Sequence, residues 1–189
     1  MVLRVSVYIP GYFQASLLKF QNEATTNPQD SPHRWNQPTY VAKTHYADTN
    51  NADLVDAKST LYVKRVCGKF LYYAIAVDHT MLLALNAIAT AQAHATTTTM
   101  EDIVWLLNYA ATHPDDTLHY HASNMILHVT INASYLCEER ACNRVGGLFL
   151  LPEQLVNNFN KPPTLTTRNS AIHTLCHIIK TVMSSVAEA

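Results

Sequence analysis

The sequence has little glycine, with four residues in a chain of 189. Phosphate-binding loops need several glycines in a short stretch so that backbone amides can approach the ligand, and none can be assembled here. The hydrolase motif Gly-x-Ser-x-Gly and the zinc-protease motif His-Glu-x-x-His do not occur either. Nothing in the sequence therefore indicates these enzyme classes.

An excess of basic residues is also lacking. Thirteen Lys and Arg against 14 Asp and Glu give a formal net charge of −1. Phosphate binding is driven by clustered cations that release counterions. The composition gives no electrostatic case for a nucleic-acid partner and argues against an active nuclease.

Long hydrophobic runs are missing as well. Nothing approaches the roughly 20 apolar residues that span a bilayer, and the start, MVLRVSVYIPGYF, lacks the apolar run of a secretion signal. With 48% hydrophobic residues, the chain can still bury one sizeable core or two small ones. We expect an intracellular protein, cytoplasmic or nuclear, with no targeting signal and no membrane partner.

The four cysteines are spread through the chain, and in an intracellular setting we expect them to be free thiols. A structural zinc site usually has closely paired ligands, so buried or loop thiols are favoured over zinc. His119 and His121 would share a strand face and are interpreted as solvated, because no third ligand stands at a suitable spacing. The set that could supply four zinc ligands is Cys137, Cys142, Cys176 and His177.

Helical periodicity dominates the first two thirds of the chain. A short strand in the first eight residues and Pro10-Gly11 should precede an amphipathic helix from Tyr12 to Gln21. Gly68 lies inside a later helix at a cost of about 1 kcal/mol relative to Ala, which predicts a closely packed neighbouring helix. The further predicted helices are Leu61–Val77, Thr80–Ala93 with Asp78 as its N-cap, and Met100–Thr112.

Two polar segments interrupt this pattern. Residues 22–58 contain Pro28, Pro32 and Pro38 and show no sustained period, so we expect a linker that drapes over the surface or is disordered. Residues 152–170 are predicted to form a second polar loop. Neither segment is expected to contribute regular structure.

The stretch from residue 118 to 151 has the alternation of strands. Met125–Tyr135 and Val145–Leu151 are rich in β-branched and aromatic residues and flank a polar segment, which predicts an antiparallel hairpin. Ala171–Ile179 should add beside the second arm. Alternation places the apolar residues of the first arm, such as Ile131, on one face and Asn132 on the other.

These motifs resemble the ribonuclease H domain of copia-type retrotransposon polyproteins. Asn132-Ala-Ser-Tyr stands where that family has Ser-Asp-Ala-Ser/Asp-Tyr/Trp, and Arg144-Val-Gly-Gly-Leu-Phe-Leu resembles its Arg-Ser-x-Gly-Gly/Tyr-x-Phe-Leu. The final MSSVAEA is similar to the family's Ser-Ser-x-Glu-Ala-Glu, with Glu188 matching the first Glu. Two upstream stretches resemble the end of the family's polymerase. They are Pro10-Gly-Tyr and the block from Val66-x-Gly-x-Phe-Leu-Tyr-Tyr through Leu106-Leu-Asn-Tyr-Ala.

The resemblance covers nearly the whole chain and implies an α+β fold. A helical polymerase-tail segment would precede a truncated, ribonuclease H-like antiparallel sheet of three strands. The implied parts are 1–21, a strand and helix from the polymerase; 22–58, a linker; 59–116, a helical connection; and 117–189, an incomplete ribonuclease H-like domain.

Catalysis in this family uses Mg²⁺ held by clustered carboxylates, and it cleaves RNA in RNA–DNA hybrids. The family's first metal-binding Asp is Asn132 here, and an amide carbonyl is a poor ligand for a hard divalent cation. The second Glu of the final motif, which is the family's next metal ligand, would lie beyond Glu188, and the polymerase motif Tyr-x-Asp-Asp does not occur. We therefore expect no intact catalytic residue and no metal or cofactor.

The resulting hypothesis is a degenerate fragment without autonomous catalysis. An incomplete sheet would leave apolar residues uncovered, so we expect marginal stability and self-association through a sheet edge. Two alternatives stay open: an interaction or structural module that reuses the fold, or a piece of a longer, active reverse transcriptase and ribonuclease H.

Overall fold

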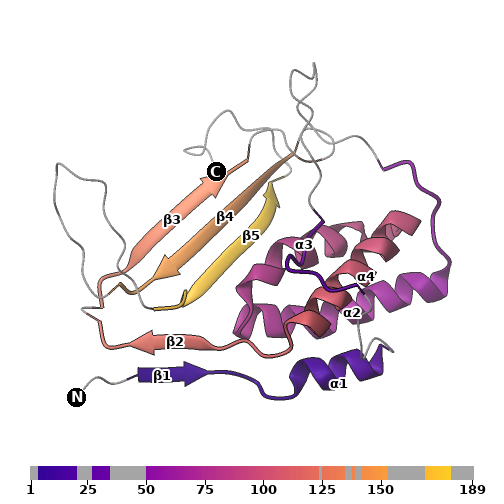
Figure 1. Ribbon diagram of the computed structural model, residues 1–189. Coiled ribbons are helices and arrows are strands. Elements are labelled where there is room, and N and C mark those ends of the chain that lie inside the picture. Colours follow the sequence, from indigo (N-terminus) through magenta and orange to yellow (C-terminus); the bar gives the residue numbers. More distant parts are fainter. Residues whose placement is uncertain are drawn as a thin grey trace.

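Helices occupy one end of the structure and two antiparallel sheets the other (Figure 1). This computed structural model describes residues 4–20, 27–34, 50–123, 125–134, 138, 142–152 and 169–179. The predicted mixture of helices with an antiparallel three-stranded sheet is confirmed. Within the described ranges, no helix is both long and apolar enough to cross a membrane.

All four predicted helices form. The one expected at Thr80–Ala93 is shorter and has a tight 3₁₀ turn at each end, in part because the Asp78 carboxylate accepts bonds from the backbone N–H and the hydroxyl of Thr80. The elements are α1 (Tyr12–Lys19), α2 (Ala57–Ala76), η1 (His79–Met81), α3 (Leu82–Ala91), η2 (Gln92–His94) and α4 (Thr97–Thr112).

The start of α2 was predicted four residues too late. Its N-cap is Asp56, whose carboxylate accepts a bond from the backbone N–H of Ser59 at 2.8 Å. This capping signal lies inside the segment assigned to the linker, where the density of polar residues concealed it.

The hydrophobic core lies between the four helices. Phe13 of α1 is fully buried, with its ring centroid 4.2 Å from that of Tyr73 and 5.6 Å from that of Phe70, both on α2. Leu85 of α3 and Leu106 of α4 belong to the same core. Although α1 was assigned to a separate part, 1–21, it packs in one core with the helices of 59–116; the four-part division itself stays a prediction.

Gly68 does not lie against a neighbouring helix, so that prediction is wrong. A side chain added there would have no neighbour within 4 Å, because the residue is on the exposed side of α2. The helices that pack on α2 contact its opposite side, through residues such as Val66 and Phe70.

The predicted hairpin and third strand are confirmed. β3 (His128–Ala133), β4 (Asn143–Leu150) and β5 (His173–Ile179) form an antiparallel sheet in that order. The first arm begins later than predicted, since Met125 has a left-handed φ of 57° that interrupts the extended chain. Tyr135 lies outside the described residues.

A second, two-stranded sheet pairs the strand that precedes α1 with the strand that follows α4. β1 (Arg4–Val7) pairs antiparallel with β2 (Leu118–His121), with Val7 opposite Leu118. This pairing was not predicted, because nothing in the sequence connects two short strands on either side of the helices.

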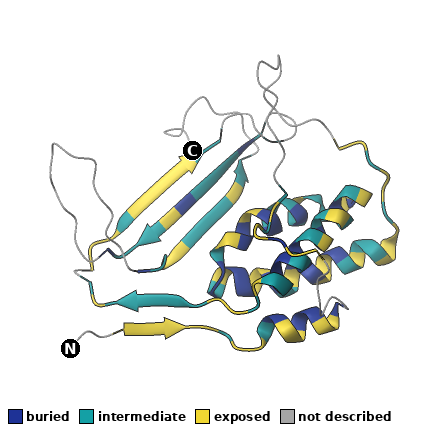
Figure 2. Ribbon diagram, in the orientation of Figure 1, coloured by how far each residue is buried: buried dark blue, intermediate teal, exposed yellow. Residues whose placement is uncertain are grey.

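The three-stranded sheet meets the helices through its β5 edge, and β3 lies farthest from them (Figure 1). The register places Val129, Phe149 and His173 on one face, and Arg144 with Cys176 on the other. Arg144 reaches Asn86 of α3, so α3 lies on the second face. Figure 2 shows that β3 is mostly exposed.

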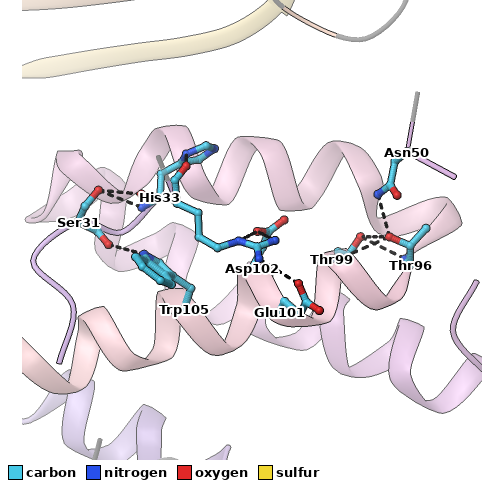
Figure 3. Close-up of polar contacts among 9 residues, drawn as sticks. Ser31, His33, Asn50, Thr96, Thr99, Glu101, Asp102 and Trp105 are labelled. Carbon is cyan, nitrogen blue, oxygen red and sulfur yellow. Dashed lines mark hydrogen bonds and ion pairs between the residues drawn. The ribbon is translucent and has the colours of Figure 1, made fainter. Parts of the chain in front are cut away.

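The predicted linker drapes over α4 in both parts that the structure describes. Residues 27–34 run antiparallel to this helix, where the Trp105 indole N–H donates to the Ser31 carbonyl at 2.8 Å (Figure 3). Near residue 50 the Asn50 amide donates to the Thr96 hydroxyl at 2.9 Å. The other contacts of the first part are Arg34 with Glu101 and Asp102, Gln29 with Thr112, and Asp30 with His113.

Candidate functional site

Asn132, the position at which the resemblance expects a metal-binding Asp, lies on β3. It is exposed and stands opposite Gly146 of β4, which in turn stands opposite Cys176 of β5. Because side chains of opposed residues share a face, Asn132 and Cys176 are on the same side of the sheet. Gly146 carries no side chain, so none stands between them in this row.

The charged group on this face is a guanidinium. Arg144 is two residues from Gly146 on β4, and its side chain is only 10% exposed. Its Nε donates to the Glu138 carboxylate at 2.6 Å, and its Nη1 lies 2.5 Å from Asn86 Oδ1 and 3.7 Å from the Cys176 sulfur. Burial alone would lower the pKa of Arg144, but the bonds to Glu138 and Cys176 raise it overall, so the group stays cationic.

This donor set does not fit Mg²⁺. The described strands β3, β4 and β5 contain no Asp or Glu, and Glu138 is already paired with Arg144. A magnesium site needs anionic oxygen atoms, whereas Asn132 offers a neutral amide and the charged group on this face, Arg144, is a cation. Within the described ranges, no group of three His, Cys, Asp or Glu side chains is placed to hold a metal ion.

Two of the residues considered for zinc, Cys176 and His177, lie on opposite faces of the sheet. Cys176 and His177 are consecutive on β5, so their side chains point to opposite sides. Because they point to opposite sides, the structure does not bring Cys176 and His177 together as ligands. Cys137 lies outside the described residues. Cys142 and Cys176 are free thiols, as is Cys67, where burial raises the pKa to about 11.

His119 is bound to the neighbouring strand rather than only to solvent. Arg4 Nη2 lies 2.8 Å from its Nε2, and the Ser6 hydroxyl lies 3.1 Å from its Nδ1. His121 lies two residues further along β2, opposite Arg4. These contacts connect β1 with β2, so we interpret His119 as a structural residue of this sheet.

Two buried polar interactions were missed. The side chain of Asn169 connects β2 with the end of β4, and it lies in a segment predicted to be only a polar loop. The Asp78 carboxylate accepts from the Tyr109 hydroxyl at 3.1 Å as well as from Thr80. Asp78 was found as a cap, but no spacing rule connects it with Tyr109, which is 31 positions away.

Glu188, matched to the first Glu of the family's final motif, lies outside the described residues. The family resemblance rests on the sequence motifs. Comparisons of the chain with protein-family models, with curated proteins and with solved structures find no match.

Proposed function

We propose that this chain is a degenerate remnant of the reverse transcriptase and ribonuclease H region of a copia-type retrotransposon polyprotein, without catalysis of its own. The observation that carries the proposal is the antiparallel order β3-β4-β5 with Asn132 on β3. This is the strand on which the resemblance expects the first metal-binding Asp. In this proposal the helices upstream correspond to the polymerase tail.

The chemistry of the Asn132 face supports the absence of hybrid cleavage. Cleavage by two metal ions needs several carboxylates within a few ångströms to hold the cations and activate water. Here the Arg144 guanidinium lies on the same face and would repel a divalent cation. An RNA–DNA hybrid remains the family's substrate, and the described part of this sheet offers no cluster of cations to bind its phosphates.

The test is a cleavage assay on purified protein. A labelled RNA–DNA hybrid is incubated with Mg²⁺ or Mn²⁺, and we expect no cleavage above a buffer control. Asn132→Asp supplies one carboxylate but no second ligand, so we expect this variant to be inactive as well.

The matched control is Asn132→Ala. Cleavage by the natural chain that is abolished by this substitution would contradict the proposal and assign a catalytic function to Asn132. Cleavage that survives the substitution would point to a contaminating nuclease, which a repeat with protein from a second purification route would detect.

A second candidate is an interaction module, and exposed apolar residues favour it. Leu127, Val129 and Ile131 of the first hairpin arm are 54, 39 and 51% exposed. Exposed apolar residues that lie close together are typical of binding surfaces. A defined partner that buries them would favour this function over an inactive remnant.

The third possibility, a piece of a longer active enzyme, can be tested on the coding DNA. An in-frame continuation past Ala189 that supplies the metal-binding Glu of the family's final motif would favour the longer enzyme. A stop codon there, together with inactivity in the hybrid assay, would favour the remnant.

A further inference from the structure

Helix α2 is apolar on two sides. Its core side is buried, and its opposite side carries seven exposed residues at helical spacing, which we call the outer face. Four of them are large and apolar, with exposed fractions of 47, 41, 61 and 58% for Leu61, Leu71, Tyr72 and Ile75 in turn. A surface helix normally presents polar residues there. The outer face is Leu61, Lys64, Arg65, Gly68, Leu71, Tyr72 and Ile75.

Gly68 is at the centre of the outer face. A side chain added at this position would meet nothing within 4 Å, so packing inside the chain does not explain the glycine. A helix interior favours Ala over Gly, and Gly is useful where another backbone approaches closely. The flanking apolar residues provide side walls for such an approach.

The charged residues within α1 and α2 are all basic. The neighbouring helix α1 carries one Lys and no acidic residue, and α2 carries four Lys and Arg and no acidic residue. Lys64 and Arg65 lie on the outer face, and neither forms an ion pair with a described residue. Lys69 lies to one side, with its ammonium 4.3 Å from the centre of the Tyr12 ring.

We propose that the outer face of α2 is a docking surface for an acidic amphipathic helix. The partner packs its apolar side across Gly68, between Leu61 and Ile75, and places its carboxylates beside Lys64 and Arg65. The apolar residues supply affinity, and the cations select the sign of the partner's charge and its orientation. A second copy of this chain fits less well, since two copies of α2 would meet with cations on both sides and no anion. This proposal is independent of the ancestry proposed above.

The probe is a synthetic amphipathic peptide of three heptads with leucine on one side and glutamate on the flanks. A matched peptide carries lysine in place of every glutamate. We expect fluorescence anisotropy to show saturable binding of the acidic peptide to the full chain. The basic peptide should bind at least about tenfold more weakly than the acidic one. Added salt should weaken binding of the acidic peptide.

Two variants locate the binding. Gly68→Leu fills the space needed for close approach, so we expect about tenfold weaker peptide binding with no loss of thermal stability, because the added side chain points into open space. Val104→Leu, on the exposed side of α4, is its control and should leave binding unchanged. Arg65→Glu should weaken binding about tenfold. Lys58→Glu reverses a charge in the first turn of the same helix, before the outer face begins at Leu61, and should have a smaller effect.

Four results would overturn the proposal. Equal affinity for the acidic and basic peptides, or binding that is unaffected by Gly68→Leu, would show that the outer face is not the recognition surface. Binding to vesicles that contain phosphatidylserine, with none to the peptide, would assign the face to a lipid surface. Self-association in sedimentation that Gly68→Leu abolishes would assign it to a second copy.

Discussion

At the residue scale, buried polar side chains connect elements of the fold that lie far apart in the sequence. The Asn169 side chain, in a residue 8% exposed, accepts from the His121 N–H at 2.6 Å and donates to the carbonyls of His121 and Leu151. These bonds connect β2 with the end of β4, close to the start of β5. Asn132, in contrast, is exposed on β3.

We expect Asn169→Ala to lower the free energy of unfolding by about 2–3 kcal/mol. The change leaves the His121 N–H and two carbonyls without their amide partner, and a buried group without a partner costs about 1–3 kcal/mol. Urea unfolding followed by circular dichroism measures the effect. Asn132→Ala, the same change at an exposed position, should stay within about 0.5 kcal/mol; equal losses for the two variants would contradict the role given to Asn169.

Tyr109 makes stability depend on alkaline pH. Burial, together with the nearby Asp78 carboxylate, raises its pKa from the ordinary 10.0 to about 12. The unfolded chain therefore loses this proton at lower pH than the folded chain does. The stabilising contribution is complete below about pH 10 and is lost as the pH rises to about 12.

We expect the Tyr109→Phe variant to lose less stability than the natural chain between pH 10 and pH 12. Phenylalanine has no proton to lose in this range, although other partly buried tyrosines such as Tyr62 retain some pH dependence. Urea midpoints measured at several pH values provide the comparison. Identical pH profiles for the two proteins would show that Tyr109 ionises as easily in the folded state as in the unfolded chain.

At the element scale, the Thr96-Thr-Thr-Thr run begins α4 through a capping box. The Thr96 hydroxyl accepts from the Thr99 N–H, and the Thr99 hydroxyl accepts from the Thr96 N–H at 3.1 Å. As sequence, the run is only a low-complexity stretch, and identical residues do not indicate which of them is the cap. Asn50 also binds Thr96, so this helix end fixes one described part of the linker.

Thr96→Ala should cost about 1 kcal/mol, because it removes the cap and the bond from Asn50. Thr97→Ala is the control, since Thr97 is exposed in the first turn and is not part of the capping box. Thermal unfolding of both variants gives the difference. If both lower the midpoint equally, helix propensity rather than capping explains the loss.

Much of the element order was predictable because it depends on local periodicity. The stripe of α2 and the alternation of β3 can both be read from neighbouring residues, and both predictions are confirmed. The pairing of β1 with β2 was not predictable, as it depends on the arrangement of the helices between them. The position of Asn132 on a strand was predicted correctly, but the presence of Arg144 on the same face depends on register and on contacts with α3.

At the scale of the whole molecule, the helical core is well covered and the three-stranded sheet is not. Val129 and Ile131 lie on the face away from α3, and no described strand pairs with the outer edge of β3. From Met125 to Ser134 the sequence contains no Lys, Arg, Asp, Glu or Pro. Edge strands without such residues are prone to pair with another chain.

We expect the isolated chain to bind a hydrophobic dye and to associate through β3. Ile131→Lys should reduce both effects, since it places a charge on the edge strand where the side chain is 51% exposed. Sedimentation velocity and dye fluorescence measure them, and Val104→Lys on α4 is the control. A monodisperse monomer with one cooperative thermal transition above about 65 °C would contradict the expectation and favour an independent module.

The pairing of β1 with β2 has a consequence for the order of folding. Arg4 and His119 are 115 positions apart, and closing so long a loop in an unfolded chain would cost about 4 kcal/mol of entropy. The cost largely disappears once α1 contacts α4, because β1 ends at Val7, shortly before α1, and β2 begins at Leu118, shortly after α4. We therefore expect the helices to become protected before the β1–β2 ribbon in pulse-labelling hydrogen exchange, and ribbon amides protected first would refute this order. During synthesis, residues 4–7 would then wait without a partner until the ribosome has released His121.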